Sequence, residues 1–277
     1  MMEFDKLTTK QFDLFRDFIY RHSGIRMDVN KITLATNRIR RRMKANQLED
    51  FDAYYALLTS RAGNAEMECF LDAVTTNETS FFRTNSHFEW FKEQFIPELV
   101  QRELRGEHGK QLRVWSAACS TGEEPYSLAM CVSESSLMLR DWKFSILGTD
   151  ISESVLRDAK LAVYKRKVVE EVPEQRLRRH FEAAADGQTF TLRSSVREMV
   201  QFRRHNLMNS LHVTQFDCIF IRNVLIYFDR ESKAAVIKHL IQSLARGGYL
   251  VVGPSEGIYD MLEPLEKKQT FLYQKPL

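Results

Sequence analysis

Residues 113–127 read Arg-Val-Trp-Ser-Ala-Ala-Cys-Ser-Thr-Gly-Glu-Glu-Pro-Tyr-Ser. The segment begins as an apolar strand, turns at Ser120-Thr121-Gly122 and continues into an amphipathic stretch from Tyr126 to Leu139. In α/β folds, a strand, a tight glycine turn and a helix bring backbone N–H groups and a helix N-terminus against a ligand. The segment therefore predicts a ligand-binding βα unit.

The residue at the end of the next strand and the composition of the turn narrow the class of ligand that fits. The next apolar strand ends in Asp150, where such folds hold the two hydroxyls of a ribose. The single Gly122 does not give the G-x-G-x-x-G spacing that admits a pyrophosphate. Glu123 and Glu124 would repel a phosphate and suit a nucleoside with amino or sulfonium charge, as in S-adenosylmethionine. The alternative is an ordinary turn whose glutamates meet the positive helix start.

The composition is that of a globular protein with one large or two modest domains. The chain has 277 residues, of which 44% are hydrophobic and 28% charged. A net charge of +3 is too small to imply nucleic acid by itself, and no apolar run approaches the roughly 20 residues of a membrane helix. The four cysteines form no C-x-x-C pair, which argues against a metal site. We therefore expect a soluble cytoplasmic protein without membrane insertion.

The spacing of apolar residues divides the chain in two. Residues 1–75 have helical spacing, as in Phe12, Phe15 and Ile19. From residue 113 onward strands and helices alternate, with strands at 113–119, 144–149, 216–221, 249–253 and 270–275, and helices at 126–140, 152–163 and 231–246. This alternation predicts an α/β fold with a mainly parallel sheet covered on both faces. Gly247 and Gly248 are interpreted as the C-cap of the last helix.

Between Tyr164 and Asn206 the alternation is interrupted. A charged helix is predicted at about 174–181, followed by strands Thr189–Leu192 and Val196–Phe202 that turn at Ser194-Ser195. A hairpin of this kind is an appendage to a parallel sheet. It is either a recognition element or an elaboration without a role.

A basic helix is predicted near the N-terminus. Between Val29 and Leu48 there is no acidic residue, and the basic residues are Lys31, Arg38, Arg40, Arg41, Arg42 and Lys44. At helical spacing Lys31, Arg38 and Arg42 share one face. Such clustering indicates an acidic partner, which could be nucleic acid, an anionic membrane or an acidic protein surface. The alternative is a solvent-facing helix balanced by acids elsewhere in the fold.

Three further segments carry a resemblance to a known family. They are residues 75–83, containing N-x-T-x-F-F-R, residues 216–229, containing R-N-V-x-I-Y-F, and Ser255-Glu256. Together with residues 115–127 and Thr149-Asp150, they make the chain similar over nearly its whole length to the bacterial chemotaxis receptor methyltransferases, the CheR family. The resemblance implies a helical domain at 1–75 and a class I methyltransferase domain at 76–277 on a doubly wound sheet. The second domain would include a linker at 76–90 and an inserted antiparallel β-subdomain at 165–203.

The resemblance also implies a reaction. A methyl group would pass from S-adenosylmethionine to glutamate side chains of chemoreceptor cytoplasmic domains, giving γ-methyl esters for chemotactic adaptation and S-adenosylhomocysteine as product. By the same resemblance Arg83 and Tyr227 line the methyl-transfer site. The implied cofactor residues are Asn77, Thr79, Arg83, Glu124, Asp150, Asn206, Leu207, Arg222 and Asn223, and Glu123 is an alternative to Glu124. Taken singly, Tyr227 could be a packed tyrosine, Asn206 a helix cap and Arg222 a structural ion pair.

The resemblance gives the basic helix a partner. Receptor methylation regions are glutamate-rich helical bundles, on which Lys31, Arg38, Arg42 and Lys44 would dock. In some family members the β-subdomain also grips a peptide at the receptor's C-terminus. Two rival interpretations stay open, a nucleic-acid methyltransferase and a non-catalytic sensor of S-adenosylmethionine. The absence of an N/D-P-P-Y/F sequence after residue 221 argues against a nucleic-acid substrate.

Overall fold

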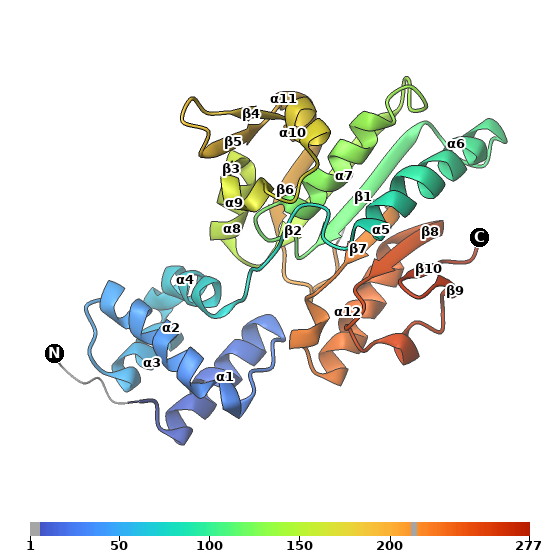
Figure 1. Ribbon diagram of the computed structural model, residues 1–277. Helices are drawn as coiled ribbons and strands as arrows, with labels where there is room; N and C mark the ends of the chain where they lie inside the picture. The colour runs from blue at the N-terminus through green and yellow to red at the C-terminus, as the bar shows by residue number, and fades with distance from the viewer. Residues whose placement is uncertain (1–5, 212–214) are drawn as a thin grey trace.

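A computed structural model describes residues 6–211 and 215–277, and its N-terminal part is helical (Figure 1). The helices of this part are α1 (Thr9–Ser23), η1 (Val29–Lys31), α2 (Ile32–Ala45), α3 (Phe51–Thr59), η2 (Arg61–Gly63) and α4 (Asn64–Val74). Helix α1 begins at a capping box between Thr8 and Gln11 and ends at Gly24, whose φ of 73° needs glycine. Its buried Phe12, Phe15 and Ile19 confirm the helical spacing predicted for this region.

The chain then crosses to the second domain through residues 75–84. Helix α5 (Asn85–Trp90), the π-helical turn η3 (Phe91–Phe95) and helix α6 (Ile96–Leu104) lead into the main sheet. Figure 1 shows the N-terminal helices as a separate cluster beside the sheet, joined to it by this segment. The N-terminal domain therefore lies beside the main sheet.

Within the described ranges, seven strands form the main sheet in the order β6-β2-β1-β7-β8-β10-β9. Its strands are β1 (Gln111–Ala117), β2 (Lys143–Asp150), β6 (Val200–Arg204), β7 (Phe216–Ile221), β8 (Leu244–Val252), β9 (Glu266–Gln269) and β10 (Leu272–Gln274). Strands β6, β2, β1, β7 and β8 pair in parallel, and β10 and β9 form an antiparallel edge. These pairings confirm the mainly parallel α/β sheet.

Alternate side chains of the strands feed two apolar layers. Val114 of β1 belongs to the cluster that contains residues of helix α7 (Glu123–Glu134), whereas the adjacent Trp115 belongs to the cluster of helix α12 (Arg230–Ser243). Helix α8 (Glu153–Leu161) follows β2. Both faces of the sheet are thus buried, as the near-continuous apolar strands predict.

The inserted antiparallel subdomain is confirmed, but the pairing of its strands differs from the prediction. Its antiparallel sheet has the order β3-β5-β4 and consists of Val163–Lys165, Thr189–Leu192 and Phe181–Ala183. Helices α9 (Arg166–Val169) and α10 (Glu174–His180) lie between its strands. The predicted hairpin of Thr189–Leu192 with Val196–Phe202 is wrong. Residues Ser194–Arg197 form helix α11, and the following β6 pairs with β2 of the main sheet.

The prediction that Gly247 and Gly248 cap the last helix is also wrong. Helix α12 ends at Ser243, and Gly247 and Gly248 lie within β8, opposite a register shift in β7. A Cβ on Gly248 would stand 3.0 Å from the carbonyl oxygens of Ala245 and Phe216. Gly248 therefore serves the close approach of two strands at an irregular pairing, whereas Gly247 has φ 70° and lies against Arg102 and Leu277. Neither glycine is a helix C-cap.

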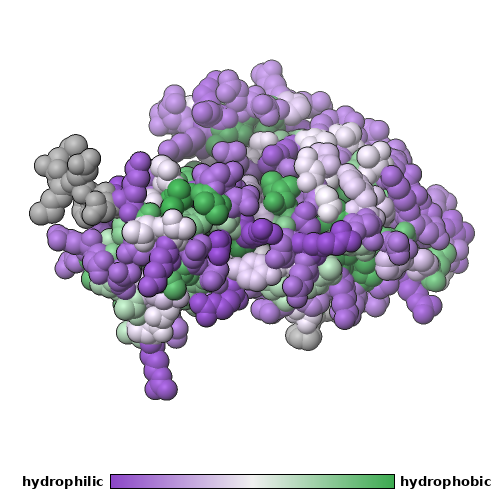
Figure 2. Space-filling view, turned by 90° about the horizontal axis from the view of Figure 1, so that it is seen from below, coloured by the Kyte–Doolittle hydropathy of each residue, from purple (hydrophilic) through white to green (hydrophobic). Residues whose placement is uncertain are grey.

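One face of the molecule is mainly polar. Figure 2 shows a face on which hydrophilic residues predominate and hydrophobic residues gather in small patches. Across residues 6–211 and 215–277, no helix combines the length and the apolar character that crossing a membrane requires.

Candidate functional site

A cavity opens at the carboxyl ends of four parallel strands. It is lined by residues that directly follow β1, β2, β6 and β7, and by residues of the N-terminal domain and the 75–83 segment. The strand order reverses between β1 and β7, which is where doubly wound sheets bind ligands.

The turn after β1 forms one wall of the cavity. Ala118, Ser120 and Gly122 all have positive φ, at 63°, 49° and 94°. The Ser120 N–H donates to the Asp150 carboxylate at 2.9 Å, and the Ser120 hydroxyl donates to the Asn77 carbonyl at 2.9 Å. For the non-glycine residues Ala118 and Ser120 this conformation is strained, and such strain clusters at ligand sites and persists where the surroundings over-determine it. The turn is therefore fixed to both β2 and the 75–83 segment.

Asp150 lies at the end of β2, as predicted, and lines the cavity. Its carboxylate accepts hydrogen bonds from the backbone N–H groups of Ser120 and Ser152 at 2.9 and 3.0 Å. Burial raises the pKa of Asp150, and these backbone donors oppose the rise. The donors fix the carboxylate at the place where a ribose would be held.

Glu124 and Arg222 form a buried ion pair in the cavity wall. Glu124 accepts from Arg222 Nη1 at 3.0 Å and from the Ser116 hydroxyl at 2.8 Å. The side chains of Arg222 and Glu124 are only 2% and 12% exposed. Glu124 lines the cavity, whereas Glu123 is buried beside Thr121, where burial raises the pKa of Glu123. This geometry favours Glu124 over its neighbour as the ligand-facing acid.

Asn223 lies on the loop after β7 in a left-handed conformation with φ 58°. Buried Glu256 holds this loop, because its carboxylate accepts from the backbone N–H groups of Asn223 and Leu225, the latter at 2.8 Å. Burial raises the pKa of Glu256, which these backbone donors oppose. The loop geometry that places Asn223 in the cavity thus depends on one carboxylate.

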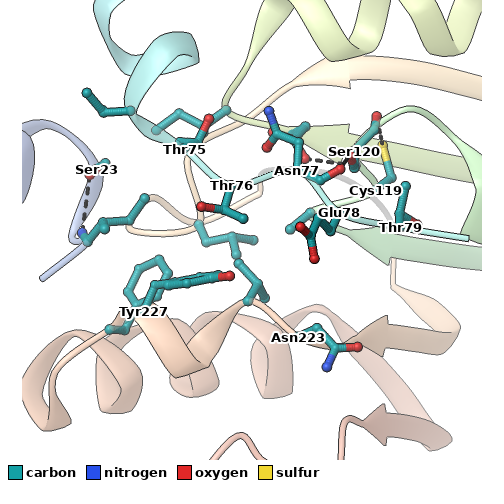
Figure 3. Close-up of a pocket in the computed structure, with 18 of the residues that line it drawn as sticks. Ser23, Thr75, Thr76, Asn77, Glu78, Thr79, Cys119, Ser120, Asn223 and Tyr227 are labelled. Atoms are coloured by element: carbon teal, nitrogen blue, oxygen red, sulfur yellow. Dashed lines mark hydrogen bonds between the residues drawn. The ribbon is translucent and has the colours of Figure 1, made fainter. Parts of the chain in front are cut away.

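The 75–83 segment forms one side of the cavity. Figure 3 shows Thr75 to Thr79 lying along one side of it, with Tyr227 and Asn223 on the opposite side. Asn77, Thr79 and Arg83 all line the space. Arg83 is exposed, and its Nη1 donates to the Glu78 carbonyl at 3.1 Å.

The loop after β6 brings two more predicted residues to the cavity. Leu207 is buried, and Asn206 donates through Nδ2 to the His22 carbonyl at 2.8 Å. Asn206 Oδ1 also accepts from the Met208 N–H at 3.0 Å. Asn206 therefore ties the loop to the N-terminal domain in addition to lining the cavity.

Tyr227 projects into the cavity from the loop after β7 (Figure 3). Its backbone carbonyl accepts from the Arg26 N–H at 2.8 Å, which fixes this loop to the N-terminal domain. Lys31 Nζ lies 5.4 Å from the centre of its ring. Among residues 6–211 and 215–277 its hydroxyl has no hydrogen-bond partner. The hydroxyl is thus free to bind a substrate.

Of the four predicted docking residues, three face the cavity or solvent and one is paired within the N-terminal domain. Lys31 and Arg38 line the cavity, and Lys44 is exposed on α2. Arg42 instead pairs with Glu66 of α4 at 2.6 Å, and Glu66 also accepts from the Tyr54 hydroxyl at 2.6 Å. For Arg42 the alternative of balance by an acid elsewhere in the fold is therefore correct. Sequence spacing showed no nearby acid because Glu66 belongs to another helix.

Arg38 has a structural contact that the sequence did not predict. Its Nη1 donates to the Thr75 carbonyl at 3.0 Å and also to the Val74 carbonyl. Arg38 therefore caps the C-terminus of α4, at the start of the segment that carries Asn77 and Thr79.

All nine predicted cofactor residues and both predicted catalytic residues line this one cavity. They are Asn77, Thr79, Arg83, Glu124, Asp150, Asn206, Leu207, Arg222, Asn223 and Tyr227, with Arg83 in both sets. Ser120 and His205 also line the cavity and Glu256 lies behind Asn223, although the sequence predicts no role in the site for these residues. The Ser255-Glu256 pair, which carries part of the family resemblance, could have indicated a role for Glu256. No sequence pattern distinguishes Ser120 from any other serine in a turn.

Comparison with known proteins agrees with this arrangement. Residues 77–271 match the model of the CheR methyltransferase SAM-binding domain, and residues 10–75 match the CheR methyltransferase all-alpha domain. A chemotaxis protein methyltransferase 1 from Pseudomonas aeruginosa is 36% identical, covering 90% of this chain and 91% of that protein. Chemotaxis protein methyltransferase Cher2 from Pseudomonas putida is 32% identical, covering 95% and 97%.

A third relative, the chemotaxis protein methyltransferase of Salmonella typhimurium, is 30% identical and covers 96% of this chain and 90% of its own length. The two matched domains account for the helical cluster and for the doubly wound sheet with its cavity. S-adenosylmethionine, the nucleoside with sulfonium charge expected from the turn after β1, is the cofactor of the matched binding domain. The chain belongs to the CheR methyltransferase family and is an S-adenosylmethionine-dependent chemotaxis protein methyltransferase.

Proposed function

We propose that this chain methylates glutamate side chains of chemoreceptor cytoplasmic domains, forming γ-methyl esters for chemotactic adaptation in the cytoplasm. One observation carries the proposal. The ring of Tyr227, whose hydroxyl has no hydrogen-bond partner among the described residues, has its centre 5.4 Å from Lys31 Nζ, and Arg38 of the same N-terminal domain also lines the cavity. A carboxylate substrate entering from this side would meet positive charge and a hydrogen-bond donor.

The chemistry needs little more than positioning. A glutamate carboxylate with a pKa of about 4.3 is already ionised at neutral pH, so no general base is required. S-adenosylmethionine supplies the methyl group on a sulfonium, and cation and anion become neutral products. We propose that Tyr227 orients the carboxylate by donating a hydrogen bond, and that Arg83 orients cofactor or substrate without clamping the attacking oxygen.

The other predicted residues would hold the cofactor. Asp150 would accept from the ribose hydroxyls, and Glu124 would face the positive charge of the amino acid portion. The remaining members of the set are Asn77, Thr79, Asn206, Leu207, Arg222 and Asn223. Most of these lie on loops that the hydrogen bonds described above already fix, so little ordering would remain on binding.

Tyr227→Phe and Arg83→Ala are expected to lower kcat for receptor methylation by about 10- to 100-fold, because each removes a group that orients the reacting atoms. Binding of S-adenosylhomocysteine should change little in Tyr227→Phe. Both quantities can be measured with labelled cofactor and a purified receptor fragment. Unchanged turnover in both variants would overturn the assigned roles. Exposed Tyr259, which lies outside the cavity lining, provides the matched control Tyr259→Phe.

The reaction itself is tested with methyl-labelled S-adenosylmethionine and a purified receptor cytoplasmic fragment. Alkali-labile label that disappears when receptor glutamates are replaced by alanine would support the proposal. Binding of S-adenosylhomocysteine without transfer to several receptor fragments would contradict it and favour a sensor. Transfer to RNA or DNA would favour the nucleic-acid alternative.

We further propose that the basic face of α2 docks on the glutamate-rich helices of the receptor. Lys31, Arg38 and Lys44 carry this proposal, whereas Arg42 is left out because Glu66 neutralises it. The subdomain strand β4 lies at the edge of its sheet, where it would pair with a receptor C-terminal peptide.

Lys44→Glu is expected to raise KM for the receptor fragment about three- to tenfold with little change in kcat, because a surface charge affects encounter with the partner. The difference from wild type should shrink as salt rises from about 50 to about 300 mM, because the Debye length falls below about 10 Å once the ionic strength exceeds about 100 mM. Lys267→Glu, an exposed charge on β9, is the matched control. A salt-independent effect, or an equal effect of the control, would contradict docking through α2.

A further inference from the structure

The inserted subdomain contacts two loops of the active-site cavity. Phe81, two residues before Arg83, packs edge-on against Tyr164 of β3 and Phe181 of β4, with ring centres 4.8 and 5.4 Å apart. The Tyr164 hydroxyl donates to the Thr121 carbonyl, in the turn after β1, at 2.9 Å. The subdomain is therefore part of the wall that supports the site, in addition to any partner it binds.

A further contact of the subdomain with the 75–83 segment involves Arg176 of α10. Its guanidinium carbon lies 4.1 Å from the centre of the Phe82 ring. Its Nε and Nη2 donate to the two oxygens of Glu134, at 2.8 and 3.1 Å. Because this contact is bidentate, it fixes the plane of the guanidinium as well as its position.

Glu134 is a firm anchor for Arg176. It lies at the end of α7, its side chain is 8% exposed, and it also accepts from Lys92 Nζ at 2.6 Å. Burial opposes its ionisation, but hydrogen bonds from His180, Arg176 and Lys92 together lower the pKa of Glu134. The carboxylate thus stays charged and keeps Arg176 in place over Phe82.

Phe82 needs such support because its backbone is strained. Its φ of 53° is left-handed, which is rare for a bulky side chain, and Thr84 has φ 59°. The Phe82 N–H donates to the Ser127 hydroxyl at 3.0 Å. The Phe82 ring packs against the Phe88 ring, with ring centres 5.4 Å apart. Arg83 lies between two left-handed residues, so its direction depends on contacts that hold this conformation.

We propose that Arg176 is a positioning residue for Arg83. Arg176 is fixed by its two hydrogen bonds to Glu134 and stacks on Phe82. This stacking holds the left-handed turn that directs the Arg83 side chain into the cavity. Arg176 touches neither the cofactor nor the substrate in this role. The inference rests on the proposed role of Arg83 in methyl transfer and cofactor binding.

The first test compares Arg176→Gln with wild type. We expect kcat for receptor methylation to fall about tenfold, affinity for S-adenosylhomocysteine to fall three- to tenfold, and receptor KM to stay within a factor of two. Arg178→Ala is the matched control, because Arg178 lies on the same helix, is 78% exposed and pairs with Glu174. Arg176→Lys keeps the charge but loses the planar stack, and should recover only part of the loss.

A double-mutant cycle with Arg83→Ala separates positioning from a general structural effect. If Arg176 acts through Arg83, Arg176→Gln should cause no further loss of S-adenosylhomocysteine affinity in the Arg83→Ala background. Additive losses, or wild-type affinity and kcat in Arg176→Gln, would overturn the proposal. Phe82→Leu removes the stacking ring and leaves Glu134 paired, so it repeats the test if Arg176→Gln unfolds. Affinity is measured without receptor, so failure of receptor methylation would be distinguishable from failure of this inference.

Discussion

Arg222→Leu is expected to lower the free energy of unfolding by about 3–5 kcal/mol and to abolish measurable S-adenosylhomocysteine binding. The side chain of Arg222 is 2% exposed and pairs with Glu124, which is 12% exposed. Removing the cation leaves a carboxylate charge in a poorly solvated wall, where the Ser116 hydroxyl still donates to it. Arg222 also donates to the Arg83 carbonyl, so the loop that carries Arg83 would lose an anchor.

Urea unfolding and calorimetric titration with S-adenosylhomocysteine measure the two effects. Adding Glu124→Gln to Arg222→Leu should recover part of the stability, because no buried charge is then unpaired, but it should not recover binding. Arg230→Leu is the matched control, since Arg230 is 81% exposed and its pair with Asp260 should contribute less than about 1 kcal/mol. Cofactor affinity within threefold of wild type in Arg222→Leu would show that the pair is only structural.

Glu256→Ala is expected to weaken S-adenosylhomocysteine binding by about 10- to 100-fold and to lower stability by about 2–4 kcal/mol, because it leaves two backbone donors without an acceptor. The N–H groups of Asn223 and Leu225 both donate to Glu256, which is 1% exposed. Without the carboxylate, the left-handed Asn223 would relax toward a more favourable φ and leave the cavity. Glu256 itself does not line the cavity.

Glu256→Gln offers a graded comparison, because its single carbonyl oxygen can accept from one N–H while its amide group faces the other. We expect its cofactor affinity to lie between those of wild type and Glu256→Ala. Exposed Glu266, on β9, provides the control Glu266→Ala. Equal affinity in Glu256→Ala and wild type, measured on folded protein, would disprove the dependence of Asn223 on this carboxylate.

Much of the fold could be predicted from local patterns. Residues 113–127 contain a strand, a turn and a helix, and the structure places β1, the turn and α7 there. Asp150 could be assigned to the end of a strand because apolar residues precede it and a helix follows. Such features depend on neighbours in the sequence, so the sequence contains the information needed to predict them.

The errors share one physical cause. The apolar residues around 200 predict a strand, but their spacing does not say which sheet it joins, and parallel pairing with β2 decided it. Gly247 and Gly248 have the composition of a helix C-cap, yet both lie in β8, where Gly248 allows a close approach to β7. Strand partners are separated by dozens of residues, and local periodicity does not encode them.

In the site, too, local sequence patterns predict some features and tertiary packing decides the others. The sequence by itself determined which residue types lie at the ends of the strands, and with them a nucleoside site with acidic character. The tertiary structure decided which charges are neutralised. Arg42 and Arg38 have the same charge and lie one turn apart on α2, but Arg42 meets Glu66 while Arg38 caps α4 at the cavity. Only the packing of α2 against α4 sets these distances, and Coulomb and hydrogen-bond energies depend on them.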